Sequence, residues 1–126
     1  MTLTEKKKNE WEKTLLKLKL MSEGDSIQKH TSGDLWNFTG QTRGNYFFTK
    51  EKMIFVSGFG VETFSIAYKD IKEIKKCMIG IFIPTGIKIT ALDPIKGKEK
   101  KYKCSVMKRK SWMEFLSQKS GVTHNE

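Results

Sequence analysis

Basic residues gather in one stretch near the C-terminus of this 126-residue chain. They are Lys96, Lys98, Lys100, Lys101, Lys103, Lys108, Arg109 and Lys110. Lys101 and Lys103 are two positions apart, which places both side chains on one face if this stretch is a strand. Such a lysine ridge could bind phosphate groups. Lysine on an edge strand also prevents unwanted strand pairing, so a solvated strand edge is the alternative interpretation.

Residues suited to catalysis or metal binding are sparse. His30 and His124 are the only histidines, one in an apparent strand and the other in a polar tail. A zinc cluster and a Ser-His-Asp triad therefore both lack enough members. The aspartates lie beside predicted turns, where a turn-capping role outweighs acid–base catalysis. These aspartates are Asp25, Asp34, Asp70 and Asp93. We expect no metal, no cofactor and no enzymatic activity.

Aromatic side chains could supply apolar anchorage beside the positive charge. Trp36 and Phe59 fall near predicted loops, where they could be exposed to a ligand or to a bilayer surface. Trp11 belongs to a predicted basic helix near the N-terminus. Nearly all other aromatic residues have an inward strand parity or a core-facing helix position. Single-strand nucleic-acid binders instead interleave exposed aromatics with positive charge, so nucleic acid ranks second among the expected partners.

The formal net charge of +10 is the strongest compositional indication of a partner. Such a surface attracts nucleic acid, an anionic bilayer or an acidic protein face. Lysine far outnumbers arginine here, although a dedicated phosphate clamp more often uses arginine for bidentate contacts. A purely solubilising role of the lysines is therefore the alternative.

Length and composition indicate a single soluble domain. A chain of this length builds one core, and 37% hydrophobic residues are enough to fill it. No run approaches the ~20 apolar residues of a membrane-spanning helix, and the N-terminus lacks the apolar stretch of a secretory signal. We expect a cytoplasmic protein that can associate peripherally with the inner membrane face. In that compartment Cys77 and Cys104 are expected to be reduced core thiols.

The first predicted element is a helix over residues 5–20. Thr4 can cap its N-terminus, and Trp11, Leu15 and Leu18 share one face. The run LLKLKL within it would also fit a short alternating strand. The polar face carries lysines, namely Lys6, Lys7, Lys8, Lys13, Lys17 and Lys19. The helix could cover an open edge or end of a barrel, or it could lie on a membrane surface.

Short alternating segments follow this helix. Residues 26–31 and 35–38 are predicted to pair as a hairpin around Ser32, Gly33 and Asp34. Gly40 and Gly44 are predicted to bracket a second polar turn. Later strands are predicted over residues 71–79, 86–92 and 100–107, with Asp93, Pro94 and Gly97 in the last loop. A final amphipathic helix is predicted from residue 109 to just before Gly121, with Trp112, Phe115 and Leu116 on one face.

Residues 43–71 contain the most informative pattern, RGNYFFTKEKMIFVSGFGVETFSIAYKDI. It predicts a β-meander with turns at residues 49–52 and at the glycines of SGFG. In order and spacing it resembles the GRAM branch of the pleckstrin-homology-like superfamily. The sequence pattern of that branch begins with a glycine, continues through alternating apolar residues to a turn at a threonine, and ends in Tyr-x-Asp-Ile. Glu51 and Lys52 depart from it, because Asn and Arg are commoner there.

The resemblance covers residues 20–119 and implies a mainly β fold with helices (α+β). About seven antiparallel strands would form a split, bent barrel capped by the C-terminal helix, with the N-terminal helix as an addition. Residues 1–21 would then be a basic helical extension. Residues 22–119 would be the PH-like, GRAM-type domain, and residues 120–126 a polar tail.

The resemblance also implies where a ligand could bind. In phosphoinositide-binding members of the superfamily, basic residues on the first two strands and their loop hold the headgroup. The matching positions here are Lys29, His30 and Arg43. We expect a non-enzymatic adaptor module that recruits to an anionic membrane surface or to a protein partner through its lysine-rich face. A small nucleic-acid-binding protein and a pure protein-interaction scaffold are the alternatives.

Overall fold

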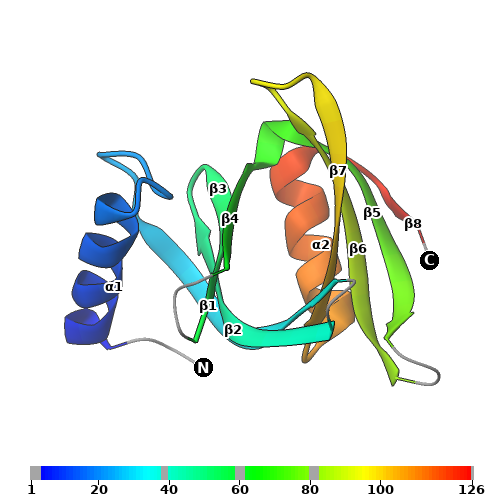
Figure 1. Cartoon of the computed structure of the whole chain (residues 1–126), viewed down its shortest axis with the longest axis horizontal. Coiled ribbons are helices and arrows are strands. Elements are labelled where there is room, and N and C mark those ends of the chain that lie inside the picture. Colours follow the sequence, from blue (N-terminus) through cyan, green and yellow to red (C-terminus); the bar gives the residue numbers. More distant parts are fainter. Residues whose placement is uncertain (1–3, 38–39, 59–61, 80–82, 126) are drawn as a thin grey trace.

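The computed structural model describes residues 4–37, 40–58, 62–79 and 83–125. These residues form two α-helices, a 3₁₀ helix and one sheet of eight strands (Figure 1). The helices are α1 (Glu5–Lys17), η1 (Tyr68–Asp70) and α2 (Arg109–Ser120). The strands are β1 (Ile27–Asn37), β2 (Gly40–Thr49), β3 (Lys52–Ser57), β4 (Thr63–Ala67), β5 (Ile71–Ile79), β6 (Ile83–Asp93), β7 (Lys98–Val106) and β8 (His124–Asn125).

The sheet has the order β4-β3-β2-β1-β7-β6-β5-β8. Strand β1 pairs with β2 along most of its length and with β7 through residues 33–36, so it joins the two halves of a bent sheet. Helix α2 lies between these halves (Figure 1). The first seven strands are antiparallel, which confirms the predicted architecture. The short strand β8 is an addition within the predicted polar tail, and it pairs in parallel with β5.

Helix α1 forms for the local reasons that the sequence indicates. The Oγ1 atom of Thr4 accepts a hydrogen bond from the Lys7 backbone N–H at 3.2 Å. Glu5 in the first turn and Lys17 in the last turn complement the helix dipole. The helix ends earlier than residue 20, because Lys19 adopts a left-handed conformation with φ of 61°. Leu18 therefore falls outside the helix and is 45% exposed.

Helix α2 closes the inner core. Its Met113 and Leu116 are 1% exposed, and Trp112 stacks on Phe48 of β2 with ring centroids 4.4 Å apart. Gly121 ends the helix with φ of 76°, and its N–H donates to the Ser117 carbonyl. The predicted bounds of this helix are confirmed.

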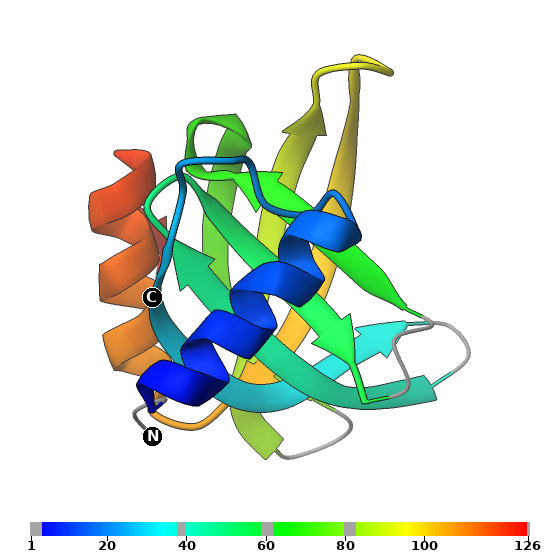
Figure 2. The ribbon, with the colours of Figure 1, turned by 90° about the vertical axis from the view of Figure 1, so that its left-hand side faces the viewer.

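The sheet buries side chains on both faces where β2 and β3 pair. Tyr46 and Phe48 belong to the inner core, whereas Phe47 and Ile54 form a second cluster with Leu15 of α1. Phe47, Ile54 and Leu15 are all 0% exposed. Figure 2 shows α1 lying across this outer face of the sheet. The helix therefore covers a face of the sheet, and the expectation of an edge or an end was wrong.

The predicted hairpin around residues 32–34 is also wrong. Ser32, Gly33 and Asp34 lie inside the continuous strand β1 and pair with β2, and Gly33 and Asp34 also pair with β7 on the other side. A Cβ atom on Gly33 would lie 2.6 Å from the Ser105 carbonyl oxygen. Glycine is needed here because two backbones approach closely where the sheet bends, and no turn is required. Phe38, at the end of that predicted hairpin, lies outside the described residues.

The second predicted turn, between Gly40 and Gly44, is part of strand β2 instead. Gly44 lies opposite Gly33 in the register of β1 and β2. The later strands follow the predictions closely. Strand β5 has the predicted bounds, β6 extends the predicted residues 86–92 at both ends, and β7 begins two residues early, at Lys98.

Candidate anion-binding surface

The β6–β7 hairpin projects beyond the rest of the molecule (Figure 1). Its tip is held by Asp93, whose Oδ1 accepts the backbone N–H groups of Ile95 at 2.9 Å and Lys96 at 3.2 Å. These hydrogen bonds, first that from Lys96, lower the pKa of the Asp93 carboxyl. Gly97 completes the turn with φ of 68° and donates its N–H to the Asp93 carbonyl at 2.7 Å. The tip is thus a defined structure.

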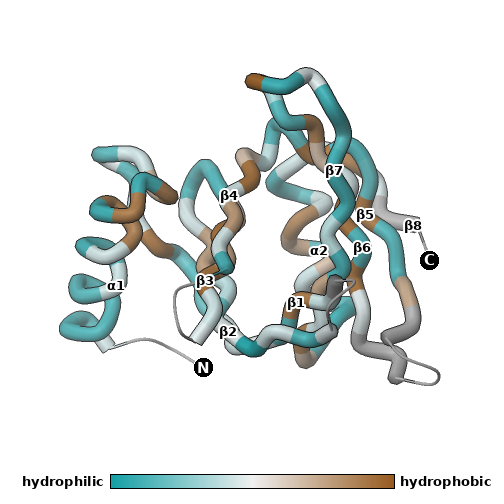
Figure 3. Tube along the Cα trace, in the orientation of Figure 1, coloured by the Kyte–Doolittle hydropathy of each residue, from teal (hydrophilic) through white to brown (hydrophobic). Residues whose placement is uncertain are grey.

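An exposed apolar side chain sits at this tip. Ile95 is 93% exposed, the highest fraction among the large hydrophobic residues that the structure describes. Figure 3 shows a hydrophobic point at the very end of the hairpin, with hydrophilic segments next to it. Lys96, Lys98 and Lys100, which follow Ile95 in the chain, are also exposed. Ile95 is not among the residues predicted from the sequence, although an apolar residue between a turn proline and a turn glycine has no strand position in which to be buried.

The lysines of β7 divide between the two faces of the sheet. Lys101 and Lys103 are exposed and share the outer face, as their spacing predicts. Lys100 has the opposite parity, and its Nζ lies 5.3 Å from the centre of the Tyr102 ring. Lys98 has the parity of Lys100. The predicted ridge is therefore confined to Lys101 and Lys103 on the outer face, while the tip lysines form a separate group.

The register of the sheet extends this outer basic face across two further strands. Lys103 lies opposite Lys88 of β6, and Lys88 lies opposite Lys75 of β5. Like charges that face each other across strands are destabilising, so this lysine row has a cost that an acidic partner would relieve. Arg109 lies nearby, and its Nη1 donates to the carbonyls of Cys77 at 3.3 Å and Gly86 at 3.4 Å. Lys75 and Lys88 were missed because pairing register is not visible in a sequence.

The other predicted basic residues lie apart from this face. Lys108 is exposed and precedes α2 in a left-handed conformation. Lys29 is an exposed residue of β1 whose Nζ lies 4.6 Å from the Phe115 ring and 5.9 Å from the Trp112 ring. The structure therefore places Lys29 against α2 and does not join it to the hairpin lysines.

The predicted apolar anchors differ in their accessibility. Trp11 packs against Phe47 with ring centroids 4.7 Å apart, so it is part of the cluster beneath α1. Trp36 is half-buried and lies opposite Lys103 on one neighbouring strand and Gln41 on the other. Phe59 lies outside the described residues. Among these three, Trp36 is the one placed beside the basic face.

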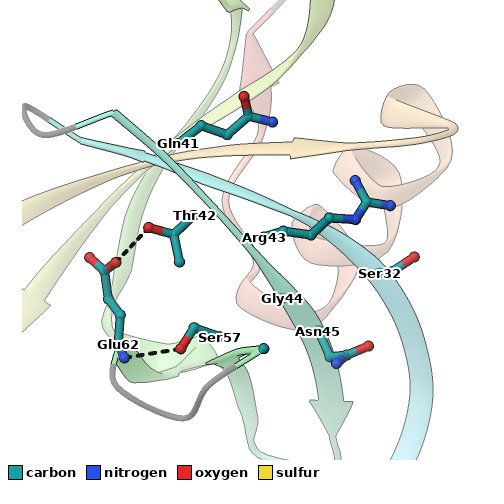
Figure 4. Close-up of a pocket in the computed structure, with 9 residues that line it drawn as sticks. Ser32, Gln41, Thr42, Arg43, Gly44, Asn45, Ser57 and Glu62 are labelled. Carbon is teal, nitrogen blue, oxygen red and sulfur yellow. Dashed lines mark hydrogen bonds between the residues drawn. The ribbon is translucent and has the colours of Figure 1, made fainter.

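Arg43 lines an open hollow of about 560 Å³ on the outer side of β1, β2 and β3 (Figure 4). Its Nη1 lies 3.4 Å from Oδ1 of Asp34, and its side chain is 75% exposed. Asp34 is nearly buried and also accepts a hydrogen bond from Gln41. The Thr42 hydroxyl donates to Glu62 at 2.9 Å on the other side of the hollow. Arg43 is thus partly neutralised, and its hollow lacks the charge surplus of the lysine groups.

Within residues 4–37, 40–58, 62–79 and 83–125, no group of three His, Cys, Asp or Glu side chains could hold a metal ion. Neither α1 nor α2 is long and apolar enough to cross a membrane. Cys77 and Cys104 are both free. Burial raises the pKa of the Cys104 thiol to about 12, so this cysteine is a neutral core residue at physiological pH.

Solved structures with the same architecture include PH domains. The N-terminal PH domain of Vps36 matches with a TM-score of 0.54 at 15% identity, over 82% of each chain. The DH/PH domains of PDZ-RhoGEF, solved in complex with activated RhoA, match with a TM-score of 0.60 at 10% identity, over 79% of this chain and 31% of that one.

A third structure, the C-terminal domain of an unknown protein from Leishmania infantum, gives a TM-score of 0.68 at 17% identity, over 89% of this chain and 95% of that chain. No protein-family model and no curated protein sequence matches the chain. At these identities the likeness defines the fold alone. The chain has a pleckstrin-homology-like fold.

Proposed function

We propose that this PH-like domain is a non-enzymatic binding module that attaches to an anionic membrane surface through its β6–β7 hairpin. The observation that supports this most strongly is Ile95, a 93% exposed apolar side chain at the tip of a lysine-bearing hairpin. An apolar group flanked by positive charge suits the boundary between acyl chains and anionic headgroups. The cytoplasmic face of a membrane, which carries anionic lipids, is the proposed location.

The proposed attachment combines two forces. Each lysine near an anionic bilayer contributes ~1 kcal/mol, and Lys96, Lys98 and Lys100 are exposed in the turn and the first residues of β7. Full burial of an isoleucine side chain contributes roughly 1.5–3 kcal/mol. Because Asp93 already holds the turn, little ordering of the hairpin is needed on binding. The pattern of residues 43–71 further supports a GRAM-type member of the superfamily.

A protein partner is the second candidate. The lysine row of Lys75, Lys88 and Lys103 offers an acidic protein face a complementary surface. The solved complex of a PH-containing exchange factor with RhoA is consistent with this alternative. A membrane is preferred because a protein interface does not by itself explain an isolated exposed apolar side chain at the tip of a hairpin with exposed lysines nearby in sequence.

Replacing Ile95→Ser should lower partitioning onto acidic vesicles roughly tenfold, since about 1.4 kcal/mol of apolar transfer would be lost. Lys98→Gln with Lys100→Gln should have an effect of similar size, and it should shrink at high salt. Co-sedimentation with neutral and with acidic vesicles across a salt series measures both changes. Met107→Ser is the matched control, because Met107 is also an exposed apolar residue (73%) but lies at the other end of β7.

Three results would count against a hairpin-led attachment. Ile95→Ser could leave vesicle binding unchanged, Met107→Ser could reduce it equally, or the protein could bind neutral and acidic vesicles alike. A parallel titration with a single-stranded oligonucleotide tests the competing polyanion. Binding to the oligonucleotide without binding to vesicles would move the proposal to nucleic acid.

A further inference from the structure

A second basic site lies away from the outer face of the sheet. It is an open hollow of about 470 Å³, which we name the lysine hollow. Its lining consists of Ser22, Lys50, Glu51, Lys52, Ala67, Tyr68, Lys69 and Lys119. The four lysines come from the β2–β3 turn, the start of β3, η1 and the end of α2. Three segments that are separate in sequence, around residues 50–52, 69 and 119, thus bring like charges to one concavity of a size that suits a small molecule.

The walls of the lysine hollow are held by hydrogen bonds. The Oγ1 atom of Thr49 accepts the N–H groups of Glu51 at 3.2 Å and Lys52 at 2.9 Å, which fixes the β2–β3 turn. The Tyr68 hydroxyl donates to the Thr49 carbonyl at 2.8 Å, which ties η1 to the same turn. Lys119 has its Nζ 5.9 Å from the centre of the Tyr68 ring. The site is therefore largely preformed.

The charges of the lysine hollow are poorly compensated. Among the described residues, none of Lys50, Lys52, Lys69 and Lys119 forms an ion pair with a carboxylate. Glu51 is the acidic residue among those that line the hollow. A second carboxylate, that of Asp25, lies beside the lining, because the Oδ1 atom of Asp25 accepts the Lys50 backbone N–H at 3.0 Å. The lysines still outnumber these two carboxylates. Like charges in a concave site raise the local positive potential, which favours an anion.

We propose that the lysine hollow binds a multiply charged phosphate group, either a phosphomonoester or a pyrophosphate. Lysine ammonium groups bind phosphate as point charges, and charge-assisted hydrogen bonds to phosphate oxygens are about twice as strong as neutral ones. Among the described residues, no arginine lines the hollow, so recognition would depend on total charge more than on planar bidentate geometry. A dianionic group is favoured over a singly charged one, because the surplus of lysines exceeds one charge.

The position of the hollow connects it to the membrane proposal. A neighbouring hollow of about 390 Å³ shares Lys52 and Ala67 with it and extends to Lys100 and Ile95 of the hairpin. A phosphorylated lipid headgroup could therefore occupy the lysine hollow while Ile95 enters the bilayer. This lipid source rests on the proposed function, whereas binding of a free phosphate compound does not.

The test compares the unsubstituted protein with the double variant Lys50→Gln, Lys69→Gln. Both side chains are exposed, so the variant should fold normally, and a thermal melt verifies this. Isothermal titration with inorganic pyrophosphate should show binding that the variant weakens by ~10-fold or more. Lys13→Gln with Lys17→Gln, two exposed residues of α1, is the control for an equal loss of charge.

A second arm identifies the source of the phosphate. Vesicles of phosphatidic acid, which carries a phosphomonoester, are compared with vesicles of phosphatidylserine adjusted to equal surface charge. Preference for phosphatidic acid that disappears in the Lys50/Lys69 variant would support a lipid headgroup. Pyrophosphate binding without any lipid preference would support a free phosphorylated compound.

The proposal that the lysine hollow is a phosphate site would be overturned if the protein did not bind pyrophosphate. It would also be overturned if the α1 control variant lost as much pyrophosphate affinity as the Lys50/Lys69 variant. That result is independent of the hairpin experiment, since Ile95→Ser changes vesicle partitioning but should leave pyrophosphate affinity unchanged. Failure of the hollow and failure of the hairpin-led attachment are thus distinguishable.

Discussion

Deleting residues 1–21 is expected to destabilise the domain by more than about 5 kcal/mol, because it uncovers an apolar face of the sheet. The deletion removes Leu15 and Met21, which are 0% and 4% exposed. It also exposes the sheet residues of the same cluster, namely Ile27, Phe47, Ile54 and Val56. Each such side chain contributes roughly 1.5–3 kcal/mol when fully buried. Since small domains have total stabilities of roughly 5–15 kcal/mol, the shortened chain should be at the margin of folding.

Urea unfolding followed by far-ultraviolet circular dichroism would measure this loss. Point variants show how much of the lost stability comes from the packing of single side chains and not from removing the whole segment. Leu15→Ala should cost roughly 2–5 kcal/mol, whereas Leu18→Ala, at a 45% exposed position just past the helix, should cost about 0.5 kcal/mol or less. A shortened protein that keeps its stability and loses only vesicle binding would show that α1 is a membrane anchor and not a cover.

The basic face of α1 does not conflict with its role as a cover. Lys13 and Lys17 are exposed, while Leu15 between them is fully buried. A hydrogen bond from the Ile27 N–H to Glu12 Oε2 at 2.8 Å also links the helix to the start of β1. The same helix can thus stabilise the outer face of the sheet and add to the positive field of the molecule.

Elements with strong local signals could be predicted from the sequence. In β2 and β3 the alternation of side chains is bounded by Thr49, whose hydroxyl fixes the turn through the Glu51 and Lys52 N–H groups. Gly121 likewise marks the end of α2 by its left-handed conformation. These features depend on contacts within a few residues, so they can be recognised without knowledge of the tertiary structure.

Features that depend on two distant strands could not be predicted in the same way. The Ser-Gly-Asp sequence around Gly33 has the composition of a turn, and only the approach of β7 explains why a glycine lies in mid-strand. The outer cluster could not be predicted either. The strand parity of Phe47 places its side chain on the face opposite the inner core, and only the structure shows that α1 covers this face. Tertiary packing overrode the local pattern in both places.

The basic surfaces also contain some residues whose placement could be predicted from the sequence and others whose placement could not. The shared face of Lys101 and Lys103 follows from strand parity and could be predicted. Lys75 and Lys88 join them only through the register of β5, β6 and β7. The lysine hollow combines the β2–β3 turn, η1 and α2, and the sequence contains no signal that these elements meet. Charge composition indicated an anionic partner, but it did not indicate which lysines lie together.

Gly44→Ala is expected to destabilise the domain by about 3 kcal/mol, near the upper end of the usual range for overpacking. A Cβ atom at this position would lie 2.4 Å from the Val56 carbonyl oxygen and 2.8 Å from the Ser57 Cα. Both are backbone atoms of the paired strand β3, so a rotamer change cannot relieve the contact. Relief would require β2 and β3 to separate at the bend where Gly44 also faces Gly33 of β1.

Gly58→Ala is the matched control for this prediction. Gly58 follows β3 directly, and the nearest contact of its added Cβ would be the Arg43 carbonyl oxygen at 3.7 Å, an ordinary van der Waals distance. Its substitution should change the free energy of unfolding by no more than about 0.5 kcal/mol. Equal unfolding midpoints in urea for the two variants would mean that the strands at Gly44 can separate without loss. In that case the close approach of backbones would not be what requires glycine at the bend of the sheet.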